Sequence, residues 1–230
     1  MCRFGCFGCL HSTICKLVCK VIKLKVCEDN MNMKALLIIL LFIVSFSLHT
    51  VLCQNKYILN CKKALLEKSL DIAFTQVGIT ERTGKNDGDV EKYLLSVGLR
   101  KGFPYCAAGQ YYCFIVAADI LRLSYREIPI KRTGIANEIF NSAAAMGEKI
   151  EYSLRKHDLI VWRVLNGSSG HIERVCKVIK AGWVLTIGFN TSSGETGTQR
   201  DGQGVFLRKR NIFHPLGRMA IRGIIGFKTM

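Results

Sequence analysis

The hydrophobic pattern changes period after Gly147, and this change constrains the fold more than any other feature of the sequence. Before it, apolar residues recur at spacings of three and four, which predicts helices over 57–77, 89–97, 106–123 and 135–146. After it, short β-branched and aromatic segments separated by Gly, Asn and Ser predict strands over 158–164, 171–179, 183–189, 204–210 and 220–227. Helices followed by strands predict an α+β domain with helices packed on an antiparallel sheet.

A short apolar segment divides the chain ahead of this domain. Lys34 is followed by an apolar stretch over 35–48 and then by polar residues, which is the order of a secretory signal peptide. The stretch is 14 residues long and is too short to span a bilayer comfortably. We expect a signal peptide over 33–53, cleaved after Cys53, and a catalytic domain over 54–230. Lipidation of Cys53 is the weaker alternative, because Leu52 stands where a lipoprotein signal has a small residue.

Residues 1–32 form a leader with six of the 11 cysteines. One interpretation is an over-extended start, and the other is a cytoplasmic tail on an uncleaved signal anchor. A metal site at Cys2, Cys6 and Cys9 is disfavoured, because no matching Cys or His pair follows at a zinc-ribbon distance. Both interpretations direct the domain outward, so we expect it to be secreted or in the cell envelope, and membrane-anchored only if the segment is not cleaved.

The composition excludes two classes of protein and leaves a basic domain. A chain that is 49% hydrophobic and 22% charged is neither disordered nor a polytopic membrane protein. The formal net charge of +16 favours polyanions: nucleic acid, anionic lipid or envelope polymers. Nucleic acid is the weakest of these, because the basic residues are dispersed and not interleaved with aromatic residues.

Three residues have the chemistry and chain order of a Cys-His-Asn hydrolase. Cys106 follows Pro104 and begins a predicted helix, whose N-terminus favours thiolate over thiol. His171 opens a predicted strand after a Gly-Ser-rich turn, and Asn190 ends the next strand, where its side chain is placed to orient the imidazole. These residue types alone also allow an alternative, in which the cysteine only packs in the core and the histidine makes hydrogen bonds only to nearby residues.

The local sequences resemble the CHAP branch of the NlpC/P60-type cysteine peptidases, which have a papain-like fold. The resemblance covers about 60–228 and includes Pro-Tyr-Cys-Ala-Ala at 104–108, Gly-His-Ile at 170–172 and Gly-Phe-Asn-Thr at 188–191. It implies that Cys106 is the nucleophile, His171 the general base and Asn190 the third polar residue.

The resemblance also implies a substrate and a mode of action. The expected activity is hydrolysis of a peptidoglycan amide, by an N-acetylmuramoyl-L-alanine amidase or a peptide endopeptidase. We expect no cofactor, no metal and no nucleic-acid partner, and a monomer. Two alternatives remain: a catalytically impaired envelope-binding module of the same fold, and a toxin effector with the same chemistry.

Several residues depart from the family pattern or have no clear role in it. Gly109 and Gln110 stand where the family continues with apolar residues, and glycine weakens a helix by about 1 kcal/mol. His157 stands where a glycine is usual, and its charged neighbours predict a turn rather than a rival base. Glu81 and Asn86 lie in a loop before the nucleophile, where local capping explains them as well as function does.

Overall fold

The structure, a computed structural model, describes residues 55–151, 153–165, 167–180, 182–193 and 202–230. They belong to one compact unit, Cys53–Met230. The predicted leader, signal peptide, cleavage site and lipidation site lie outside the described residues. Within these ranges, no helix combines the length and apolar character needed to cross a bilayer.

The described residues form a mixed α/β structure around one sheet. The helices are α3 (Lys63–Thr75), α4 (Glu91–Ser96), α5 (Cys106–Ile120) and α6 (Ala136–Met146), with single 3₁₀ turns η1 (Gly88–Val90) and η2 (Tyr125–Glu127). The strands are β1 (Asn55–Cys61), β2 (Glu148–Ile150), β3 (Leu159–Val164), β4 (Gly170–Lys180), β5 (Trp183–Thr191), β6 (Gly204–Asn211) and β7 (Met219–Thr229). The sheet order is β2-β1-β7-β3-β4-β5-β6.

The first predicted helix was too long and concealed a strand. Residues 55–61 form β1, and α3 begins only at Lys63. β1 pairs in parallel with β7 along its whole length and antiparallel with β2. The sheet is therefore mixed, not purely antiparallel as predicted. The reason is tertiary, because the strand is held by a partner from the far end of the chain and its apolar spacing also fits a helix.

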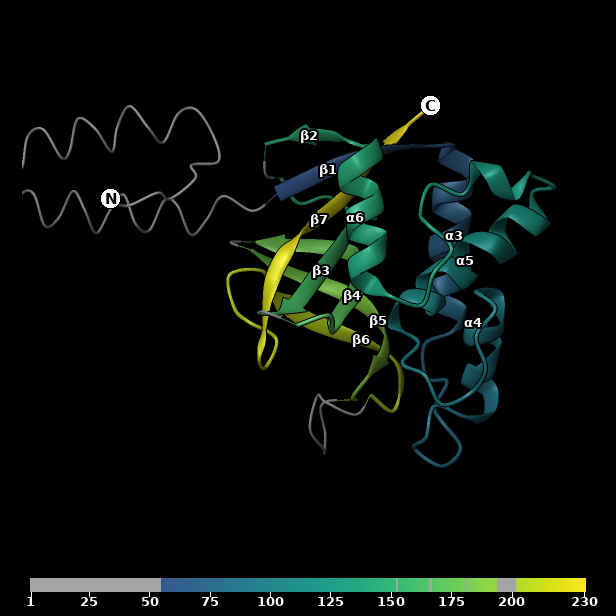
Figure 1. The fold of residues 1–230 in the computed structure, drawn as a ribbon. Helices are drawn as coiled ribbons and strands as arrows, with labels where there is room; N and C mark the ends of the chain where they lie inside the picture. The colour runs from purple at the N-terminus through teal and green to yellow at the C-terminus, as the bar shows by residue number, and fades with distance from the viewer. Residues whose placement is uncertain (1–54, 152, 166, 181, 194–201) are drawn as a thin grey trace, which may run out of the picture. The chain divides into compact units, whose positions relative to one another are not determined.

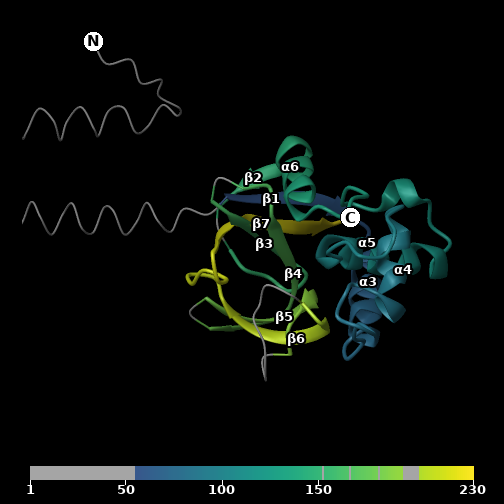
Figure 2. The same cartoon turned by 60° about the horizontal axis from the view of Figure 1, so that its bottom comes forward.

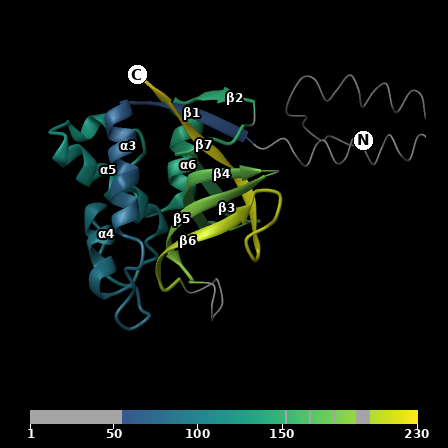
Figure 3. The same ribbon diagram turned by 180° about the vertical axis from the view of Figure 1, so that it is seen from behind.

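The helices lie in two groups around the sheet. α5 packs against β4 and β5, and α3 and α4 pack against α5. α6 packs separately against β1, β3, β4 and β7, as Figure 1 shows. Figure 2 shows the sheet curving from β1 and β7 toward β6, and Figure 3 shows from behind that α3, α4 and α5 stay together beside the strands. The start of α5 and the start of β4 thus meet between the helical layer and the sheet.

The curvature buries the central strand β3 on both faces. Leu159 and Val161 pack in the core that the helices share with the sheet. Ile160 and Trp162 point to the opposite face and pack with Val175 and other sheet residues in a separate core. The neighbouring strand β4 shares this second face, so a polar side chain on that face of β4 is also enclosed.

Gly109 and Gln110 have a packing role that their sequence context did not predict. A Cβ added to Gly109 would lie 2.2 Å from ring atoms of Phe189, so the missing side chain lets α5 approach β5 closely. Gln110 is fully buried, and its Nε2 donates to the Ile187 carbonyl at 3.4 Å. The two departures from the family pattern therefore hold the helix against the strand.

We expect Gly109→Ala to lower the free energy of unfolding by about 1–3 kcal/mol, despite the better helix propensity of alanine. The clash with Phe189 outweighs the roughly 1 kcal/mol gained in the helix. Urea unfolding measures the change. In a Phe189→Ala background the same substitution should cost nothing, and an equal cost in both backgrounds would show that the contact is not the cause.

Candidate active site

Cys106 is the first residue of α5, and its thiol lies close to the start of β4. Pro104 and Tyr105 precede it, and the Gly109 N–H donates to the Tyr105 carbonyl at 2.8 Å, which closes the first turn. The side chain of Tyr105, the N-cap residue, makes no capping hydrogen bond. The Cys106 side chain is almost enclosed, and its Sγ lies 3.9 Å from the Gly170 carbonyl oxygen. The thiol therefore faces both the helix N-terminus and the strand that carries the histidine.

His171 lies next to Gly170 on β4, and its ring is close to two functional side chains. Cys106 is near enough to raise the pKa of the ring. Nε2 lies 3.0 Å from Glu173 Oε1, which leaves Nδ1 to serve the thiol. The ring also lies beside Trp162, with centroids 6.0 Å apart. The expected pair of nucleophile and base is brought together.

Glu173 completes this arrangement, although it was not among the residues predicted from the sequence. It stands two residues after His171, so both side chains share one face of β4. It is fully buried, and Oε2 accepts from Thr186 Oγ1 at 2.6 Å and from Arg210 Nε at 2.9 Å. Arg210 Nη2 donates to Oε1, the oxygen that also contacts His171. The sequence feature that could have indicated this role is a glutamate two residues after the histidine in an apolar strand.

These contacts determine the charges of Glu173 and His171. Burial alone would raise the pKa of Glu173, but hydrogen bonds from Arg210 and His171 hold it far below its usual range. Burial lowers the pKa of His171, but hydrogen bonds to Cys106 and Glu173 outweigh it and raise the pKa to about 9. At neutral pH the ring is therefore an imidazolium that donates from Nε2 to the Glu173 carboxylate.

Asn190, the expected third residue, is not bonded to the His171 ring among the described residues. It lies on β5 where the pairing with β6 shifts register, and its backbone is left-handed with φ 53°. Its Oδ1 is buried without a hydrogen-bond partner in the described structure. The ring nitrogen that Asn190 was expected to hold is held by Glu173. The register shift breaks the alternation of side chains, so the strand pattern could not place Asn190.

His157 is held elsewhere by two structural contacts. It lies in the turn before β3, as predicted, with Nε2 3.1 Å from Glu67 Oε1. Its Nδ1 lies 3.1 Å from Nη2 of the buried Arg174. Arg174 follows Glu173 directly and therefore points to the opposite face of β4. The partner of His157 therefore lies on the other face of β4 from the His171 ring.

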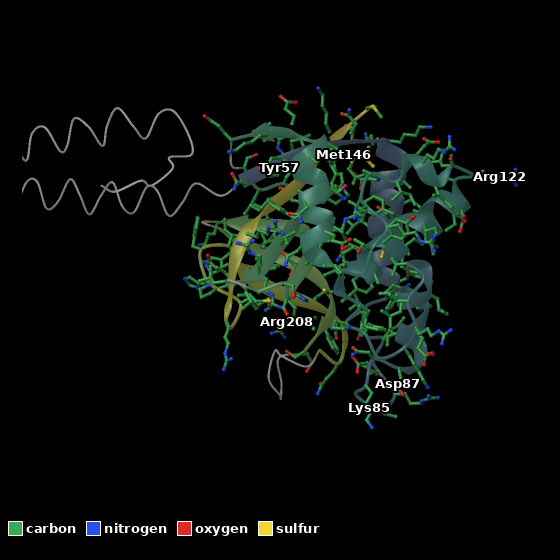
Figure 4. The ribbon with its side chains drawn as sticks, viewed as in Figure 1. Tyr57, Lys85, Asp87, Arg122, Met146 and Arg208 are labelled. Atoms are coloured by element: carbon green, nitrogen blue, oxygen red, sulfur yellow. The ribbon has the colours of Figure 1, made fainter. Side chains whose placement is uncertain are left out.

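The loop that contains Glu81 and Asn86 supports the residue before the nucleophile. Glu81 Oε1 accepts from the Tyr105 hydroxyl at 3.1 Å, and its Oε2 accepts from the Asn86 backbone N–H at 2.9 Å. Asn86 adopts a left-handed conformation with φ 54°. Figure 4 labels Asp87, the next residue of this loop, beneath the helical layer. Glu81 and Asn86 therefore fix the backbone that leads into Cys106.

A cavity of about 440 Å³ lies away from these residues. It is lined by Leu59, Asn60, Cys61, Lys62, Arg126, Glu127, Ile128, Pro129, Met146 and Met230. None of Cys106, His171 and Glu173 lines it. The candidate site is defined by side-chain chemistry and not by this cavity.

Comparisons of the chain with protein-family models, curated proteins and solved structures found no match. The assignment of a function therefore rests on the residues and their geometry.

Proposed function

We propose that this domain is a cysteine hydrolase of papain-like architecture that cleaves amide bonds in peptidoglycan. The observation that carries the proposal is the arrangement of Cys106, at the N-terminus of α5, beside His171, whose ring contacts the buried Glu173 carboxylate. Such an arrangement supplies a nucleophile, a proton carrier and a group that orients the carrier, which is the requirement for acyl transfer.

The proposed reaction has two stages. In the first, the Cys106 thiolate attacks the amide carbonyl, and the charged His171 gives its proton to the leaving nitrogen as the C–N bond breaks. In the second, the neutral His171 takes a proton from water, which attacks the thioester, releases the acid and restores the thiolate and the imidazolium. The backbone N–H of Cys106, in the uncapped first turn of α5, is the donor we propose for the developing oxyanion.

Three observations support peptidoglycan as the substrate. The sequence resembles CHAP-type wall hydrolases, the signal segment is expected to export the domain, and residues 54–230 carry 27 Lys and Arg against 15 Asp and Glu, a net charge of +12 that favours an anionic envelope. Gly109 and Gln110, the departures that permit the alternative of an impaired binding module, pack α5 against β5. Export and wall chemistry are common to a housekeeping hydrolase and a toxin, and the proposed reaction is the same for both.

Digestion of purified peptidoglycan tests the proposal directly. The purified protein should release soluble fragments that mass spectrometry identifies by bond: free stem peptides for an amidase, or shortened stems for an endopeptidase. The matched control is Cys106→Ala, which removes only the sulfur. Equal release by the wild type and the control, or no release by either, would reject the function.

A further inference from the structure

We infer that Arg210 is a positioning residue of the proposed hydrolase, which keeps the Glu173 carboxylate charged and directed at His171. The inference rests on the proposed function, because it gives Arg210 a role in the same reaction. In this arrangement Arg210 acts through its two hydrogen bonds to Glu173.

The geometry shows how an arginine two strands away reaches the carboxylate. Arg210 lies on β6 and Glu173 on β4, with β5 between them. The β5 residue directly opposite Glu173 is Gly188, and a Cβ there would lie 2.8 Å from Glu173 Oε1. The carboxylate therefore occupies the space that a side chain at Gly188 would need. Arg210 meets it there through both Nε and Nη2.

Two cations share this buried carboxylate. Glu173 Oε1 accepts from both His171 and Arg210, while Oε2 accepts from Arg210 and Thr186. A fully buried carboxylate with a single cationic partner pays a large desolvation penalty, and a second, bidentate partner offsets it. Arg210 therefore keeps Glu173 ionised, and by sharing the charge it limits how tightly His171 holds its proton.

Arg208 provides a matched control on the same strand. It stands two residues before Arg210, so the two side chains leave β6 on the same face. Its Nη1 donates to the Ser193 carbonyl, and no hydrogen bond among the described residues joins its side chain to Glu173. Figure 4 labels Arg208 near the lower edge of the sheet. The two arginines have the same charge and differ in their contact with the carboxylate.

The experiment measures how the charge of His171 depends on pH. One readout is the rate at which iodoacetamide alkylates Cys106, and the other is the NMR titration of the His171 ring. Neither needs a peptidoglycan substrate. Removing the positive charge of Arg210 raises the affinity of Glu173 and His171 for protons. Arg210→Met should therefore move the alkaline midpoint of the His171 titration upward by about one pH unit or more. Arg208→Met should move it by much less.

Two further variants separate charge from geometry. Arg210→Lys keeps the charge but cannot bind both carboxylate oxygens as a fork, so the midpoint should stay near that of the wild type while turnover falls about tenfold. In a Glu173→Gln background, Arg210→Met should produce less than half of its shift in the wild type, because the group that transmits the effect is neutral. Arg210→Lys also gives a folded reference if Arg210→Met does not fold.

The outcomes distinguish this inference from the proposed function. An unmoved midpoint in Arg210→Met, an equal shift in Arg208→Met, or a full shift in the Glu173→Gln background would overturn the role of Arg210. If Arg210→Met does not fold, unchanged turnover in Arg210→Lys overturns it. A shifted midpoint together with no release from peptidoglycan would support Arg210 and reject the proposed substrate.

Discussion

Cys106→Ala and His171→Ala should each reduce peptidoglycan turnover by about 10³-fold or more, and the double variant should be little worse than either one. The two side chains lie close enough for Cys106 to raise the pKa of His171, and they serve the same proposed step, so removing one leaves the other without a function. Initial rates on a fluorescent peptidoglycan substrate, measured for the wild type, the two single variants and the double variant, give the coupling between the two residues. Additive losses would mean that the two residues act in separate steps.

His157→Ala is the control for this prediction. Both of its ring nitrogens are engaged, with Glu67 and with Arg174, and Arg174 leaves β4 on the opposite face from His171. The variant should therefore keep most of its turnover per folded molecule, and its effect should be on stability. An inactive His157 variant beside an active His171 variant would overturn the assignment of the site.

Glu173→Ala should lower the free energy of unfolding by about 3–5 kcal/mol, because it leaves the charges of His171 and Arg210 buried without their common partner. Turnover should fall as well, since nothing then fixes the His171 ring through Nε2. Glu173→Gln keeps the shape and should cost less stability. Urea unfolding and turnover, measured on the same preparations, separate the two effects.

Asn190→Gly tests the alternative orienting residue. Glycine accepts the left-handed backbone at this position and removes only the side chain, whose Oδ1 has no partner in the described structure. The variant should keep most of its turnover. A loss equal to that of Glu173→Ala would restore Asn190 as the residue that orients the imidazole.

The sequence predicted those features that depend on neighbouring residues. The period-2 segments correspond to β3 through β7, and the later helical segments to α4, α5 and α6. Cys106 at a helix start and His171 at a strand start were also local predictions, and the structure brings the two side chains together. Periodicity, proline and glycine act within a few residues of the chain, so one sequence is enough to read them.

Only the tertiary structure decided which groups surround Cys106 and His171. β1 is a strand because β7 pairs with it, and Gly109 fits because Phe189 crosses the helix there. Glu173 orients His171 because Arg210, two strands away, offsets the cost of burying a carboxylate. Each depends on a contact between residues far apart in the chain. Burial and charge pairing are properties of such contacts, and no local pattern of residues encodes them.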